Sequence, residues 1–148
     1  MGEDALRSRG DAGVIGEKIG EESGRVVGNR VLSVDPPGPK IESSVQQTGK
    51  LLGHETTTWI TYWSVPKGEN LLEGEGQGVI MTADGEMATF VGKGVGHLTG
   101  KGAGVSFRGA LFYKTDSKAL AHLNGTCGAF EFEVDESGNT HVKVWEWK

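Results

Sequence analysis

The sequence contains one cysteine, Cys127, in 148 residues. A single thiol excludes an intrachain disulfide, and no cysteines and histidines are clustered at the spacing of a zinc site. The four histidines also lack a second histidine or a carboxylate at a recognised metal spacing. We therefore expect no bound metal and no other cofactor.

Clustered positive charge is also missing. Lysine and arginine number 15 against 20 acidic residues, and they are scattered along the chain, which leaves a net charge of -5. A nucleic-acid-binding domain usually carries a basic patch, so we expect no nucleic-acid partner. The first residues, MGEDALRSRG, are acidic and polar, unlike a signal peptide. With 36% hydrophobic and 24% charged residues, the composition suggests a cytoplasmic protein with no membrane partner.

Glycine, in contrast, is abundant, with 25 residues of 148. The glycines have no collagen-like period and alternate with valine, threonine and aromatic residues, which is typical of a turn-rich all-β fold. About eight strand patterns with short connections favour an antiparallel β-barrel over a sandwich. One short helical segment is predicted near residues 116–123. We expect residues 1–23 to be a mobile lead-in and residues 24–148 to form a single β-barrel domain.

The densest glycine stretch, GKGVGHLTGKGAG at residues 92–104, has the composition of a phosphate-binding loop. It fails the Walker A spacing, because Val95 stands where the first glycine should be and Gly102 stands where Ser or Thr should follow the lysine. A phosphate loop should also open a helix. The residues that follow, VSFRGALFYKT, alternate like a strand with Arg108 outside. A nucleotide site is therefore not expected here.

The first register prediction comes from Asp84-Gly85, a typical two-residue hairpin turn. This turn pairs Met81 with Ala88 and Val79 with Phe90. All four would share the inner face with the glycines of residues 92–96. The glycines would then leave the inner wall of the barrel bare.

The second register prediction centres a turn on Ser137-Gly138. It pairs Phe130 with Trp145 on a largely aromatic face that we expect to lie inside. Three glutamates on the opposite face, Glu131, Glu133 and Glu146, are then expected to be solvated rather than to act as an acid–base pair.

Aromatic side chains are the main candidates for a ligand site. They gather on faces predicted to point inward, and the glycines between them leave room in the barrel. The alternative is a filled core without a cavity, as in many small eight-stranded barrels. The candidate lumen residues are Trp59, Trp63, Phe90, Phe107, Tyr113, Phe130, Phe132 and Trp145.

Four stretches carry a resemblance to a known fold: GEGQGVIMTADGEMATFVGKGVG, VSFRGALFYKT, LNGTCGAFEFEVDESGNT and VKVWEWK. Together they resemble small uncharacterised prokaryotic proteins whose fold is similar to the allene oxide cyclase barrel. The resemblance covers residues 24–148 and implies an eight-stranded antiparallel barrel that forms homo-oligomers. Allene oxide cyclases bind an unstable fatty-acid epoxide in the lumen and steer its ring closure. Their active-site pattern is not found at matching positions here, so no catalytic residue is carried over.

The expected function is the binding of a small, largely apolar molecule in the barrel lumen. One alternative is an isomerase or cyclase that acts on such a molecule through polar lumen groups, with Tyr113, Thr57, Thr61 and His141 as candidates by strand parity. The other alternative is a structural or oligomeric scaffold without a ligand.

Overall fold

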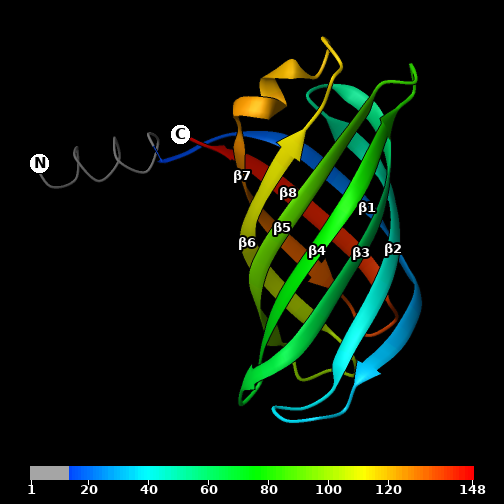
Figure 1. Cartoon of the computed structure of the whole chain (residues 1–148), viewed down its shortest axis with the longest axis vertical. Coiled ribbons are helices and arrows are strands. Elements are labelled where there is room, and N and C mark those ends of the chain that lie inside the picture. The colour runs from blue at the N-terminus through cyan, green and yellow to red at the C-terminus, as the bar shows by residue number, and fades with distance from the viewer. Residues whose placement is uncertain (1–13) are drawn as a thin grey trace, which may run out of the picture.

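The computed structural model describes residues 14–148, which form a closed antiparallel barrel (Figure 1). The strands follow chain order around the barrel, and β1 closes it by pairing with both β2 and β8. This confirms the predicted all-β barrel. Over the described residues, no helix has the length and apolar character needed to cross a membrane. The strands are β1 (Ile15–Ser33), β2 (Lys40–Leu51), β3 (His54–Gly68), β4 (Leu71–Thr82), β5 (Met87–Leu98), β6 (Val105–Lys114), β7 (Cys127–Val134) and β8 (Asn139–Trp147).

The first strand begins earlier than the sequence suggested. β1 starts at Ile15, so residues 15–23 belong to the barrel wall rather than to a lead-in. The strand is hard to recognise because its inner positions include Gly20, Glu22 and Gly24, which give no apolar alternation. The part of the predicted lead-in over residues 1–13 lies outside the described residues.

The single helical segment, η1, is a 3-10 turn at Ala121–Gly125, slightly later than residues 116–123. It lies over one end of the barrel (Figure 1). Leu120 and Leu123 are completely buried there. The Asn124 side chain fixes the preceding loop, because its amide group makes hydrogen bonds of 2.9 Å to both the backbone N–H and the carbonyl of Thr115. This end of the barrel is therefore closed by leucine side chains.

Both predicted hairpin registers are wrong by one residue. Each turn has three loop residues and ends in a left-handed glycine, Gly85 (φ 87°) or Gly138 (φ 84°). This is a type I turn followed by a bulge, the next most common hairpin after the two-residue turn. As a result Met81 pairs with Met87, and Val134 pairs with Thr140.

A shift of one residue reverses the face of a whole strand. On β4, Ile80 points inward while Val79 is exposed. On β8, Val144 is buried, and Trp145 takes the outward parity. The inner faces predicted for β5 and β6 are confirmed, with Phe90, Phe107 and Tyr113 among the buried residues.

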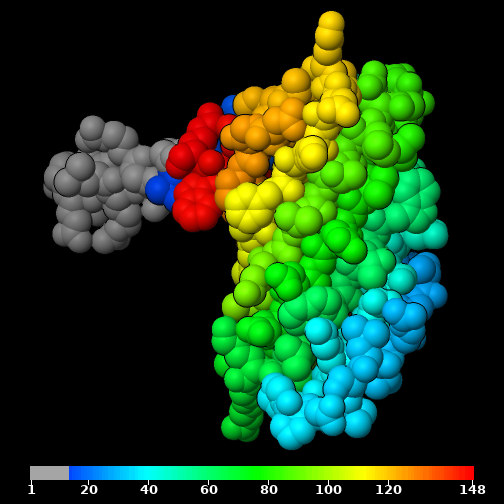
Figure 2. Space-filling view, in the orientation of Figure 1, coloured from blue at the N-terminus to red at the C-terminus, as the bar shows by residue number. Residues whose placement is uncertain are grey.

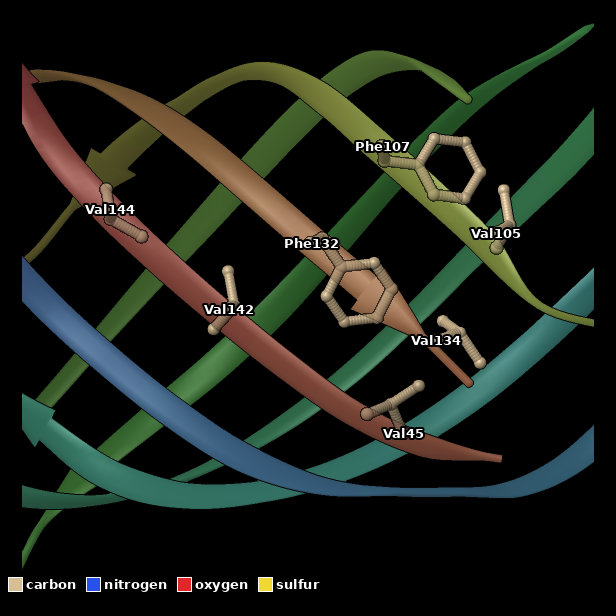
Figure 3. Close-up of a cluster of buried hydrophobic side chains, with 7 residues drawn as sticks. All are labelled: Val45, Val105, Phe107, Phe132, Val134, Val142 and Val144. Carbon is tan, nitrogen blue, oxygen red and sulfur yellow. The ribbon is translucent and has the colours of Figure 1, made fainter. Parts of the chain in front are cut away.

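The interior consists of two groups of buried side chains. The first group is drawn in Figure 3. Its residues come from β2, β6, β7 and β8: Val45, Val105, Phe107, Phe132, Val134, Val142 and Val144. The second lies beneath η1 and comprises Leu51, Ile80, Ala88, Phe90, Tyr113, Leu120 and Leu123. The core is thus divided along the barrel axis.

Candidate functional site

A cavity of about 100 Å³ lies in the barrel lumen and borders both core groups. Its lining is mostly aromatic and aliphatic. An engineered protein cavity of about 150 Å³ binds benzene, so a space of this order accepts a small organic molecule. The barrel is therefore neither solidly filled nor an open channel.

Five of the eight predicted lumen residues line this cavity: Phe90, Phe107, Tyr113, Phe130 and Phe132. The three tryptophans, Trp59, Trp63 and Trp145, are absent from the lining. Trp59 is 45% exposed, and Trp63 lies under the Lys40 ammonium, 4.2 Å from the ring centroid. The inward orientation expected for the tryptophans is thus wrong. The inner positions of β3 are occupied by Thr56, Thr58, Ile60 and Tyr62.

The inner-wall glycines are covered by aromatic rings. A Cβ at Gly74 would lie 3.0 Å from Cε1 of Phe107, and a Cβ at Gly96 would lie 2.6 Å from the same atom. A Cβ at Gly94 would lie 3.0 Å from Cζ of Phe130. The glycines of residues 92–96 are inside, as the sequence predicted, but much of the space that the inner glycines leave is filled by phenylalanines. The remaining space is the cavity.

One carboxyl group, that of Glu22, lines this apolar cavity. Its Oε2 atom accepts hydrogen bonds from the hydroxyl groups of Thr56 (2.7 Å) and Thr58 (2.8 Å). Among residues 14–148, no lysine, arginine or histidine forms an ion pair with it. Burial raises the pKa of Glu22, and the two hydroxyl bonds oppose that rise only in part.

Glu22 reaches β3 because the residue between them is a glycine. On β2, Gly49 lies opposite Glu22 of β1 and also opposite Thr56 of β3. A Cβ at Gly49 would lie 2.9 Å from Cγ of Glu22. The carboxylate therefore passes over a bare position of β2 to its two threonine donors.

Gln47 makes a similar crossing in the opposite direction. It is 1% exposed, and its Nε2 donates a 2.8 Å hydrogen bond to Oγ1 of Thr140 on β8, past Gly24 of β1. Its Oε1 atom is buried without a hydrogen-bond partner, and the residue lines the cavity. Gln47 also lies directly opposite Thr58, but its amide extends toward β8 while the Glu22 carboxylate extends toward β3.

Tyr62 and Tyr113 are the other titratable groups of the cavity wall. Burial raises the pKa of both phenols, and the nearby charge of Glu22 raises that of Tyr113 further. Of the four polar residues considered for an isomerase, Tyr113 is the one that faces the lumen. Thr57 and Thr61 lie at odd-numbered positions of β3, on the same outward face as Trp59. Nε2 of His141 lies 2.7 Å from Oε2 of Glu21 on the outer wall.

The remaining candidates lie away from the lumen. Glu131 and Glu133 face outward as predicted and pair with Arg108, whose Nη1 is 2.9 Å from Oε1 of Glu133. Glu146 is a correction, because its side chain is only 16% exposed and it pairs with His122. Among residues 14–148, no group of three or more His, Cys, Asp or Glu side chains is arranged to hold a metal ion.

Sequence reasoning missed Glu22 and Gln47, which supply the carboxylate and the amide of the cavity wall. Glu22 fell in the predicted lead-in, where no alternation marked a strand. Gln47 stands in IESSVQQTGKLLG, whose polar inner positions resemble a solvated face. One signal was present in the sequence. A glycine follows each residue two positions later, Gly24 after Glu22 and Gly49 after Gln47, and the two pairs lie on neighbouring strands.

Comparison with known proteins places the chain by fold alone. No protein-family model and no curated protein matches it. Two solved structures of unknown function are similar. A conserved protein from Rhodopseudomonas palustris has a TM-score of 0.70 and 12% identity, covering 89% of this chain and 97% of that one. A protein from Clostridium acetobutylicum has a TM-score of 0.76 and 11% identity, covering 89% and 98%. At these identities the likeness shows a shared eight-stranded barrel.

Proposed function

We propose that this protein binds a small, largely apolar molecule in the barrel lumen. The observation that carries the proposal is the cavity of about 100 Å³, which is walled by five aromatic residues of the predicted set. An apolar ligand that fills a largely apolar cavity gains free energy by burying its surface. The resemblance to the allene oxide cyclase barrel agrees, because that family also holds an apolar molecule in its lumen.

Toluene is expected to bind the purified protein with one molecule per chain, measured by isothermal titration calorimetry. Replacing Ile60, which lines the cavity, with phenylalanine is expected to weaken toluene binding at least about tenfold by filling the space. The matched control is Val79→Phe on the exposed outer wall, which should leave binding unchanged. Native mass spectrometry of protein from its own host is expected to show a co-purifying small molecule. If no such molecule were found and toluene bound to neither the wild type nor the control, the proposal would be contradicted.

We propose in addition that two copies associate through an apolar band on the outer wall. Five residues lie directly opposite one another across β5, β6, β7, β8 and β1: Val91, Phe112, Cys127, Trp147 and Ile15. The four largest are between 43% and 55% exposed. The part over β5 and β6 faces the viewer in Figure 2. Contiguous exposed apolar side chains of this kind mark interaction surfaces.

Charge favours a second copy as the occupant. A parallel row across β6, β7, β8 and β1 alternates in sign: Arg108, Glu131, Lys143 and Glu21. A twofold axis along the strands between β7 and β8 sets band against band and reverses this row. Glu131 then faces Lys143 of the second copy on both sides of the axis, so the two central contacts of the row join opposite charges.

Light scattering during size-exclusion chromatography is expected to give the mass of a dimer for the wild type. Phe112→Glu places a charge within the band and should give a monomer. Val31→Glu, at a residue 62% exposed outside the band, is the control and should remain dimeric. A monomeric wild type at high concentration would contradict this interface.

A further inference from the structure

The polar atoms left free in the lumen define the chemistry of the ligand. The two threonine hydroxyls are engaged with Oε2 of Glu22, and Nε2 of Gln47 is engaged with Thr140. What remains at the cavity wall is a set of acceptors, namely the Glu22 carboxylate and the unpartnered Oε1 of Gln47. A buried acceptor without a partner is costly, so a ligand that fills this site should bring donors.

The charge state of Glu22 further restricts the chemical class of the ligand. Both of its hydrogen-bond partners donate to a single oxygen, an arrangement that stabilises the ionised carboxylate. A buried carboxylate needs a cation, and the described residues provide none in an ion pair with it. The cavity also presents the rings of Phe90, Phe107 and Phe132, and aromatic faces attract cations.

We propose that the lumen selects a small organic amine, whose ammonium group pairs with Glu22 while its apolar body contacts the aromatic wall. This inference rests on the proposed lumen-binding function and specifies the ligand class. An anion of the same shape is excluded by repulsion from Glu22. A neutral analogue occupies the same space but leaves the carboxylate without a counter-ion.

The test compares four probes of matched shape by isothermal titration calorimetry at pH 8: benzylamine, benzyl alcohol, toluene and benzoate. Benzylamine is expected to bind at least about tenfold more tightly than benzyl alcohol, and benzoate should not bind. Glu22→Gln should remove the preference for the amine, so that benzylamine binds no more tightly than benzyl alcohol. Glu131→Gln, on the exposed outer wall, is the matched control and should keep the preference.

The pH dependence provides a second readout that requires no variant. Benzylamine affinity should fall as the pH is lowered through the raised pKa of Glu22, whereas toluene affinity should stay constant. The other titratable or charged residues at the cavity are Tyr62 on β3 and Tyr113 on β6, whose raised pKa values keep them neutral, and the residues whose backbone borders the wall: Glu21, Lys50, Glu75 and Lys93. Lys50, Glu75 and Lys93 are exposed, and Glu21 pairs with Lys18 and His141 on the outer wall, so their charges act through solvent.

The outcomes separate the two proposals. If toluene binds and benzylamine binds no more tightly than benzyl alcohol, the amine inference is wrong and the lumen-binding function stands. If none of the four probes binds, the lumen-binding function itself fails. Retention of the amine preference in Glu22→Gln would also overturn the inference, because it would place the selective group elsewhere.

Discussion

Gly49→Ala is expected to lower the free energy of unfolding by about 3 kcal/mol or more. The added methyl group would overlap the Glu21 carbonyl oxygen on β1 and would lie 2.9 Å from Cγ of Glu22. Backbone atoms cannot move aside without breaking strand pairing, so the cost exceeds that of ordinary overpacking. Urea unfolding followed by tryptophan fluorescence would measure it.

Gly28→Ala is the matched control for this substitution. Gly28 also lies in β1, but a Cβ there meets nothing within 4 Å. Alanine should therefore be tolerated, with a change within about 0.5 kcal/mol. Equal effects of the two substitutions would mean that the close approach of β1 and β2 does not determine stability. Gly49→Ala should in addition weaken any amine preference, because Glu22 loses its path to the threonines.

Phe107→Ala is expected to destabilise the protein by about 3–5 kcal/mol, the range observed for buried phenylalanines. Phe107 is 4% exposed and packs against Tyr62 and Phe132, with ring centroids 5.9 and 6.4 Å away. Its ring also covers Gly74 and Gly96. Because glycines have no side chains to relax into the hole, the new space should remain open and join the lumen. The cost should therefore lie in the upper part of the range.

The control for this prediction is Phe112→Ala on the same strand. Phe112 faces outward and is 54% exposed, so its truncation should cost less than about 1 kcal/mol when unfolding is measured at a concentration too low for self-association. Toluene should partly restore the stability of Phe107→Ala and have no such effect on Phe112→Ala. A cost below about 2 kcal/mol for Phe107→Ala would show that the wall collapses around the missing ring.

The fold class could be read from the sequence because glycine and aromatic residues alternate clearly on β5, β6 and β7. On these strands the inner positions carry rings, glycines and aliphatic side chains, as in Phe107, Gly94 and Val105. The faces of β4 and β8 could not be read, because they depended on turn length. A two-residue loop and a three-residue loop can both end in glycine, so the sequence alone does not distinguish them. The Asp135 side chain, which binds the N–H groups of Ser137 and Asn139, selects the longer form.

The candidate site was predicted in part. The phenylalanines and Tyr113 follow the rule that large apolar residues point inward. The tryptophans of β3 break that rule, because two of the inner positions on this strand are held by Thr56 and Thr58, the donors to Glu22. Polar residues on the inner face reverse the pattern on which the prediction depends. The carboxylate and the wrong orientation of Trp59 therefore have one physical cause.

The closure of the barrel by β1 and β8 has a consequence for folding. The pair Ser23 and His141 joins positions separated by more than a hundred residues, and every other neighbouring pair of strands is adjacent in the chain. Contacts at such long sequence separation form late, because loop-closure entropy must be overcome first. Until β8 has been synthesised, the growing sheet has two unpaired edges, which are sites of strand addition between molecules. We therefore expect aggregation to compete with folding mainly before the last strand joins the first.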